Sequence, residues 1–117
     1  MIGINRTLAV VRAKPEFLHL MGSLPDPNGK HDFTIDELNT DCTTFLIPLF
    51  DEPHEAEEFL DSRKPEIFEN ELLDIHQIID DWDVEIDSAT FDQYFYFEIH
   101  SVVLDLVNDE QLIHEED

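Results

Sequence analysis

Histidine and carboxylate side chains at helical spacing are the first residues in this chain that could do chemistry. The chain has six His and 29 Asp and Glu residues, and imidazole together with carboxylate suits Zn, Fe or Mn. Di-iron proteins use Glu-x-x-His pairs, because residues three apart lie on one face of a helix. Glu16 and His19 form one such pair, and Asp51 and His54 have the same spacing at an expected helix start.

A metal-binding protein or a metal-dependent enzyme is therefore the alternative hypothesis for this chain, with no particular metal indicated. Its ligands would be nearby carboxylates together with His19, His54, His76 and His100.

Glu98 and His100 are a second candidate for chemistry. Residues two apart share one face of a strand but lie about 200° apart around a helix. On a helix, Glu98 would sit at the edge of an apolar stripe, where a carboxylate must be paired, hydrogen-bonded or protonated. Two interpretations stay open: Glu98 meets a basic or backbone donor and locks the packing, or it is a functional carboxylate with a raised pKa, assisted by His100 or Ser101.

Other kinds of chemistry have little support in the sequence. Cys42 is the only cysteine, which excludes an internal disulfide and favours a reducing, cytoplasmic setting. With no His near it in the sequence, Cys42 is expected to be a small buried thiol. Three glycines do not make a phosphate-binding loop, and residues 80–87 lack the twelve-residue calcium loop with its central glycine. No catalytic residue and no cofactor are predicted, so a non-enzymatic protein is favoured.

The charge of the chain is divided very unevenly. All six Lys and Arg lie in residues 1–64, so residues 1–64 carry a net charge of −6 and residues 65–117 carry −17. Such a surface suits a basic protein partner, and we expect it to be centred on residues 66–92. The candidate partner-binding residues, which we call the carboxylate surface, are Glu66, Glu69, Asp80, Asp81, Asp83, Glu85 and Asp87.

The same charge disfavours binding to a nucleic-acid backbone or to an anionic membrane, because neither supplies cations. No segment approaches 18 uninterrupted apolar residues, and no basic region precedes a long apolar stretch. An immunity or inhibitor protein, or a mimic of nucleic-acid charge, is one concrete form of this hypothesis. Two plainer explanations stay open: the charge only keeps the protein soluble, or it reflects a salty cytoplasm.

The composition predicts a folded chain. Hydrophobic residues make up 42% and aromatic residues 10% of the sequence, which is unusual for disordered acidic segments. We expect one globular domain over residues 1–107 and an acidic tail over 108–117. The expected fold class is α+β: a mainly helical single domain with a small antiparallel sheet of two strands, or three if residues 97–107 are extended.

Two strands should build this sheet. Residues 4–13 are rich in β-branched and apolar side chains, and residues 43–50 form a second apolar run interrupted by Pro48. Because proline cannot donate to a ladder, Pro48 indicates either that the second strand lies at an edge of the sheet or that the strand ends there. We expect it to pair with the first strand in the antiparallel direction.

Turn and cap residues place the helices. A short helix should follow Pro15 and end before the turn-forming residues 25–29, and another should follow the capping box at residues 34–37. Pro53 marks a third helix start. A longer helix should begin near Pro65, with an inward stripe of Phe68, Leu72, Ile75, Ile79 and Trp82.

Residues 88–108 fit either a helix or a strand. Apolar residues recur at helical offsets, and residues 90–93 offer another capping box. This favours one helix of about 18 residues, with a strand over 97–107 as the alternative. Trp82, Tyr94 and Tyr96 could line an apolar patch that forms a homodimer, although a charge of −23 opposes self-association.

Several short stretches resemble a family of small acidic bacterial proteins of unassigned function, over roughly residues 4–107. The stretches are Phe45-Leu46-Ile47-Pro48 before an acidic helix, Glu66-Ile67-Phe68-Glu69-Asn70-Glu71-Leu72, and Phe95 with Glu98-Ile99-His100-Ser101 and Asp105-Leu106. The resemblance implies a bacterial cytosolic protein and supplies no activity.

Overall fold

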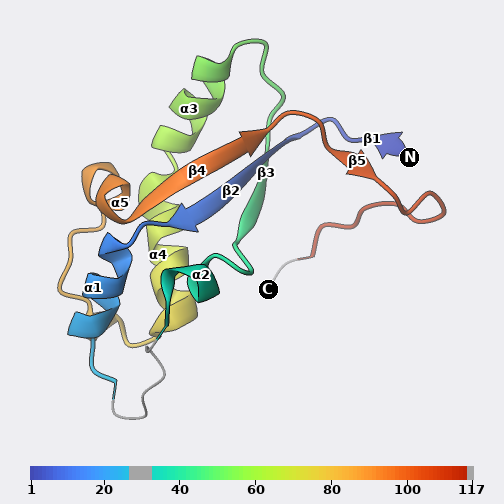
Figure 1. The fold of residues 1–117 in the computed structure, drawn as a ribbon. Coiled ribbons are helices and arrows are strands. Elements are labelled where there is room, and N and C mark those ends of the chain that lie inside the picture. The colour runs from blue at the N-terminus through green and yellow to red at the C-terminus, as the bar shows by residue number, and fades with distance from the viewer. Residues whose placement is uncertain (27–32, 116–117) are drawn as a thin grey trace.

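The computed structural model describes residues 1–26 and 33–115 and has an α+β fold (Figure 1). This confirms the predicted class, and the main antiparallel sheet has three strands, the larger of the two predicted numbers. The strands are β1 (Ile2–Gly3), β2 (Thr7–Ala13), β3 (Thr44–Ile47), β4 (Phe95–His100) and β5 (Leu104–Asp105). The helices are α1 (Glu16–Ser23), α2 (Ile35–Leu38), α3 (Pro53–Asp61), α4 (Lys64–Ile75) and α5 (Ser88–Tyr94), with a 3₁₀ turn, η1, at Ile79–Asp81.

Strand β2 is the centre of the main sheet, whose order is β3-β2-β4. Its neighbours are both antiparallel, so Ala9 lies opposite Phe45 on one side and Ile99 on the other. Alternate residues Ala9, Val11 and Ala13 are buried, as expected for side chains that share one face of a strand. The predicted pairing of an edge strand with the first strand is confirmed, and β3 ends directly before Pro48.

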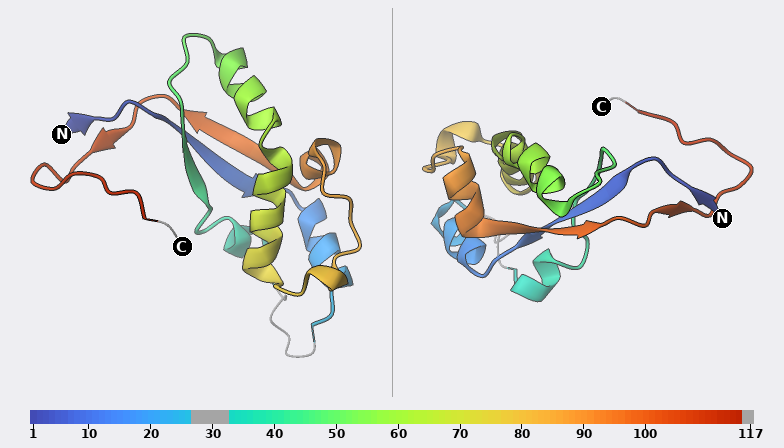
Figure 2. Two further views of the ribbon diagram at one scale, coloured as in Figure 1. Left: turned by 180° about the vertical axis from the view of Figure 1, so that it is seen from behind. Right: turned by 90° about the horizontal axis from the view of Figure 1, so that it is seen from above.

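Helices α3, α4 and α5 lie on one face of this sheet, and α2 lies on the opposite side (Figure 2). The core between the sheet and α4 is aromatic: the ring of Phe68 lies 6.3 Å from that of Phe91 and 5.8 Å from that of Phe95. Phe95 also packs against Phe17 at 4.6 Å. Helices α1, α4 and α5 and strand β4 therefore meet at one cluster of rings.

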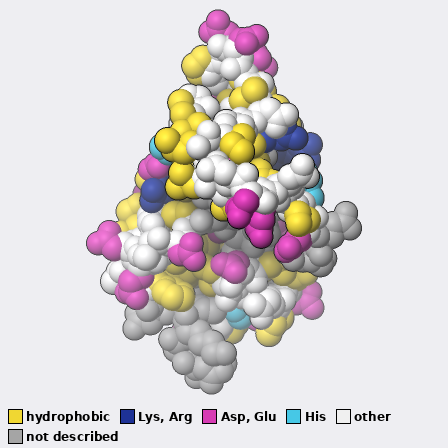
Figure 3. All heavy atoms as spheres, turned by 90° about the vertical axis from the view of Figure 1, so that its right-hand side faces the viewer, with side chains coloured by type: hydrophobic (Ala, Val, Ile, Leu, Met, Phe, Trp, Pro, Cys, Tyr) yellow, Lys and Arg dark blue, Asp and Glu magenta, His cyan; other side chains and the backbone are white. Residues whose placement is uncertain are grey.

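Strands β1 and β5 form a two-stranded arm that projects away from the helices (Figures 1 and 2). The arm makes the molecule long, with a radius of gyration of 16.1 Å, against about 13 Å for a compact domain of this length. Ile2, Val102, Leu104 and Leu106 of the arm are exposed. Figure 3 looks toward this end of the molecule and shows hydrophobic side chains on it, with acidic side chains at the top and across the middle.

The prediction of one helix over residues 88–108 is wrong. Helix α5 ends at Tyr94, and residues 95–100 pair with β2 along their full length as β4. The apolar spacing fits both structures, and pairing with β2, a partner distant in sequence, decides for the strand. The helix start was also misplaced, because Asp87 caps α5 by accepting a hydrogen bond from the Thr90 amide at 2.8 Å.

The long helix after Pro65 is shorter than the apolar stripe indicated. Helix α4 ends at Ile75, and Ile79 is 56% exposed in η1. Trp82 does pack against the core, but the chain reaches it by leaving the helix. Its indole Nε1 donates to the carbonyl of His76 at 3.0 Å, which holds the chain in this turned path.

The other local signals behave as expected where the structure describes them. The Thr34 hydroxyl accepts from the Glu37 amide at 3.1 Å, and the Glu37 carboxylate accepts from the Thr34 amide at 3.2 Å. Pro15 stands directly before α1, and Pro53 is in the first turn of α3. Of the predicted turn at 25–29, residues 27–29 lie outside the described part of the chain.

Truncation at the two ends of the predicted stripe tests where the helix stops. Leu72→Ala should lower the free energy of unfolding by about 3 kcal/mol, because Leu72 is fully buried. Ile79→Ala should change it by less than about 0.5 kcal/mol. Urea titration of both variants measures the difference, and an equal loss in both would contradict the described end of α4.

Candidate functional site

The seven residues of the carboxylate surface lie on two neighbouring parts of the structure. Glu66 and Glu69 are on α4 and are exposed. The other five lie between α4 and the start of α5, where all but Asp81 are exposed. The structure therefore places most of these side chains in solvent on an ordered frame.

Residues 82–87 alternate between the core and solvent. Trp82, Val84 and Ile86 pack against the core, whereas Asp83 and Glu85 between them are exposed. The inward side chains anchor this irregular segment, and the acids are left on its outer side. The segment is thus held by the core even though it is neither helix nor strand.

Few of these acids meet a cation within the described residues. Glu66 pairs with Arg63 at 3.6 Å, and Asp81 contacts His76 at 2.6 Å. Glu69, Asp83 and Glu85 have no ion-pair partner in that part of the chain.

Asp87 accepts a hydrogen bond as the N-terminal cap of α5. Its hydrogen bonds with the side chain and backbone of Thr90 hold the pKa of the Asp87 carboxyl below its usual range. Asp87 therefore contributes negative charge to the carboxylate surface and also fixes the start of the helix beside it.

Lys64, the last cation in the sequence, is used inside the fold. Its Nζ lies 2.6 Å from Asp61 and 2.9 Å from Asp92, and its side chain is only 14% exposed. Burial lowers the pKa of Lys64, but the bonds to the two carboxylates outweigh it and raise the pKa. Lys64 thus joins α4 to α5 and is not free to neutralise the carboxylate surface.

Glu98 and His100 lie on β4. Because Phe95 and Phe97 of the same strand pack in the core, Glu98 and His100 share the opposite face of the sheet. The Arg12 Nε lies 2.5 Å from Glu98 Oε1, and His100 Nε2 lies 3.4 Å from Glu98 Oε2. The bond from Arg12 lowers the pKa of the Glu98 carboxyl. The prediction of a raised pKa for Glu98 is therefore wrong. The contact with Arg12 fits the other interpretation, in which Glu98 meets a basic donor.

Cys42 lies beside the same arginine. Its thiol is half-buried, with Arg12 Nη1 at 3.8 Å from Sγ. Burial raises the pKa of the Cys42 thiol, although Arg12 opposes this rise. A raised pKa keeps the thiol protonated at neutral pH, which disfavours a nucleophile.

The metal hypothesis gains no support from the geometry. Within residues 1–26 and 33–115, no three His, Cys, Asp or Glu side chains come close enough to share a metal ion. Glu16 and His19 lie on α1, and Asp51 and His54 lie at the start of α3. The helices separate the two pairs instead of bringing them together.

The three aromatic residues of the predicted dimer patch do not come together on the surface. Trp82 and Tyr94 pack against the core, and only Tyr96 is exposed. Other exposed apolar side chains are spread over the arm, the edge strand β3, the turn η1 and the segment after β5. In the part of the chain that is described, no helix has both the length and the apolar character that crossing a membrane requires.

Sequence reasoning missed a groove of about 550 Å³ along the edge of the sheet, which we call the edge groove. Phe45, Leu46 and Ile47 of β3 line one side, and Glu66, Glu69 and Leu73 of α4 line the other. Two residues of the carboxylate surface therefore stand on its rim. No sequence signal locates this groove, because it depends on how far α4 lies from β3.

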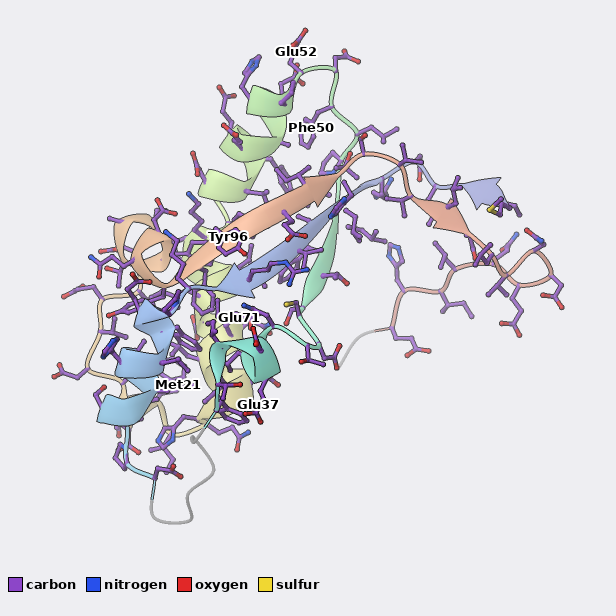
Figure 4. All side chains as sticks on the ribbon, viewed as in Figure 1. Met21, Glu37, Phe50, Glu52, Glu71 and Tyr96 are labelled. Carbon is purple, nitrogen blue, oxygen red and sulfur yellow. The ribbon has the colours of Figure 1, made fainter. Side chains whose placement is uncertain are left out.

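Glu71 is a second feature that the sequence did not reveal. It points from α4 toward the end of α2 (Figure 4), into a cavity of about 70 Å³ shared with Asn39 and Cys42. Its Oε1 is buried without a hydrogen-bond partner in the described structure. Burial raises the pKa of the Glu71 carboxyl, Thr43 lowers it in part, and Asp74 adds to the rise.

Removing the Glu71 charge should stabilise the protein at neutral pH. The unfolded carboxyl ionises near its ordinary pKa of 4.5, whereas the folded one keeps its proton to higher pH. The native state therefore binds more protons in this window, and its stability falls as pH rises through it. Glu71→Gln should raise the free energy of unfolding at pH 7 by about 1 kcal/mol. It should also remove the decrease in stability that accompanies the ionisation of Glu71.

Urea titrations from about pH 4 to about pH 8, in steps of about one pH unit, measure how the free energy of unfolding depends on pH. Glu69→Gln, on the same helix but exposed, is the control and should keep the wild-type pH dependence. Identical pH profiles for Glu71→Gln and the wild type would contradict the buried charge.

Comparison of the chain with protein-family models, with curated proteins and with solved structures finds no match. The resemblance to small acidic bacterial proteins therefore stays a prediction, and the function has to be argued from the site itself.

Proposed function

We propose that this protein is a non-enzymatic interaction protein of the cytosol that presents the carboxylate surface to a basic protein partner. One observation carries the proposal: Glu69, Asp83 and Glu85 are exposed on an ordered frame and have no ion-pair partner among the described residues. The cytosolic setting is supported by the half-buried single cysteine, whose thiol is free.

The segment that carries Asp83 and Glu85 is fixed at both ends, which favours binding. Residues 82–87 are held by the Trp82 indole bond at one end and by the Asp87 cap at the other. A partner that docks here does not have to order the segment, so less conformational entropy is lost on binding. The chain as a whole, with a net charge of −23, attracts a basic protein from a distance and speeds the encounter.

A mimic of nucleic-acid charge, or an immunity or inhibitor protein, is the concrete form that we favour. Asp83, Glu85 and Asp87 recur at every second residue, so they offer negative charges at regular intervals. A protein that binds a phosphate backbone contacts it with Lys and Arg side chains. The same side chains would bind these carboxylates in place of phosphates.

Recovery of partners from the native cytosol at low salt tests this proposal. Immobilised protein should retain basic proteins, and these should elute as salt is added, because the attraction is screened over about 8 Å at physiological ionic strength. A set of partners recovered equally well at low and high salt would contradict the proposal.

A charge variant identifies the surface responsible. Asp83→Asn/Glu85→Gln should slow association with the recovered partner about threefold to tenfold, with little effect on its dissociation rate. Glu57→Gln/Glu58→Gln on α3 removes the same charge from exposed positions outside the carboxylate surface and is the matched control. Surface plasmon resonance measures both rates, and an equal slowing in the two variants would leave only the net charge as the cause.

A further inference from the structure

The outer edge of β3 offers unpaired main-chain groups. The Val11 amide donates to the Thr43 carbonyl at 3.1 Å, which makes this a hydrogen-bonded pair of the β2–β3 ladder. Pairing alternates along antiparallel strands, so Phe45 and Ile47 also bond to β2. The amides and carbonyls of Thr44 and Leu46 therefore point away from β2, and they have no hydrogen-bond partner among the described residues.

The edge groove lies along this free edge. Phe45 and Ile47 project from the helix-covered face of β3, whereas Leu46 between them projects from the opposite face. A hollow lined by all three residues must follow the edge of the strand rather than either face. An extended chain placed there would meet both the unpaired main-chain groups and the side chains of α4.

We propose that the edge groove binds an extended segment of the basic partner as a fourth strand on β3, with an apolar side chain in the hollow and a Lys or Arg at Glu69. This inference rests on the proposed function and names the part of the surface that reads the partner's main chain. Main-chain hydrogen bonds supply affinity in such strand addition, and the side-chain sites supply specificity.

The floor and the rim of the groove select this ligand. Ile47, Leu60 and Ile67 are buried in the floor, and Leu46 is 49% exposed beside them, which suits an apolar side chain. On the rim, Arg63 already pairs with Glu66 and lies over the Phe59 ring at 5.2 Å. Glu69 is left as the carboxylate for a cation of the ligand.

The charges of this chain argue against two other occupants. A second copy would bring its own net charge of −23 to the groove. The segment of the same chain after β5 carries Asp109, Glu110 and Glu115, which Glu69 would repel. A basic segment of another protein has neither problem.

A peptide titration followed by NMR tests the groove directly. The probe is acetyl-Lys-Val-Lys-Val-Lys-amide, added to ¹⁵N-labelled full-length protein at low salt. The amides of Thr44, Leu46 and Glu69 should shift together, and the acidic peptide acetyl-Glu-Val-Glu-Val-Glu-amide should leave them unchanged. Glu69→Gln should weaken binding about threefold, whereas Glu58→Gln, which lies outside the groove, should not.

Strand addition is tested without altering the protein. N-methylation of either the Val amides or the central Lys amide of the peptide blocks one of its two hydrogen-bonding edges, and one of the two forms should lose about fivefold in affinity. Equal binding of both methylated forms and the parent peptide would overturn strand addition. Concentration-dependent shifts of Thr44 and Leu46 without peptide would overturn it too, because they indicate a second copy in the groove.

The outcome also separates this inference from the proposed function. If the basic peptide shifts Asp83 and Glu85 but not Thr44 and Leu46, the edge groove is not the site and the proposed function stands. If the peptide shifts none of these amides, the edge groove is overturned. The proposed function is then tested by the recovery of partners from the cytosol. It is contradicted if no basic protein is recovered that elutes with salt.

Discussion

Aromatic packing around Phe68 holds together the half of the chain that has no Lys or Arg. The rings of Phe91 and Phe95 contact Phe68 from α5 and β4, so burial of apolar area opposes the mutual repulsion of 17 carboxylates after residue 64. Because this core takes the apolar side of every element around it, the acids are placed on the outside. The carboxylate surface is a consequence of that arrangement.

Three of the six Lys and Arg side chains form ion pairs with acids that follow residue 64. Arg12 binds Glu98 between β2 and β4, Arg63 binds Glu66 at the start of α4, and Lys64 binds Asp92 between α4 and α5. These ion pairs connect residues 1–64 to residues 65–117, but they neutralise only a few of the acids in residues 65–117. The remaining acids form a negative surface on a segment that packs against the core, which is the combination that a basic partner can use.

Local signals in the sequence predicted local structure well. The Thr34 capping box and the edge strand ending at Pro48 depend only on neighbouring residues or on the missing proline amide. The switch from α5 to β4 could not be read in this way, because the same apolar spacing fits a helix and a strand and β2 decides between them. The edge groove and the buried Glu71 were missed for a similar reason, since both arise where α4 packs beside segments distant in sequence.

The most direct test of the account is the free energy of unfolding as a function of NaCl at pH 7. If the carboxylates are exposed and largely unmatched, their repulsion destabilises the folded chain, and screening should raise the free energy of unfolding as NaCl increases to about 0.5 M. Sucrose at matched osmolality controls for general solvent effects. A free energy of unfolding that falls with NaCl would mean that the acids are matched by cations in the native state, and it would contradict the account.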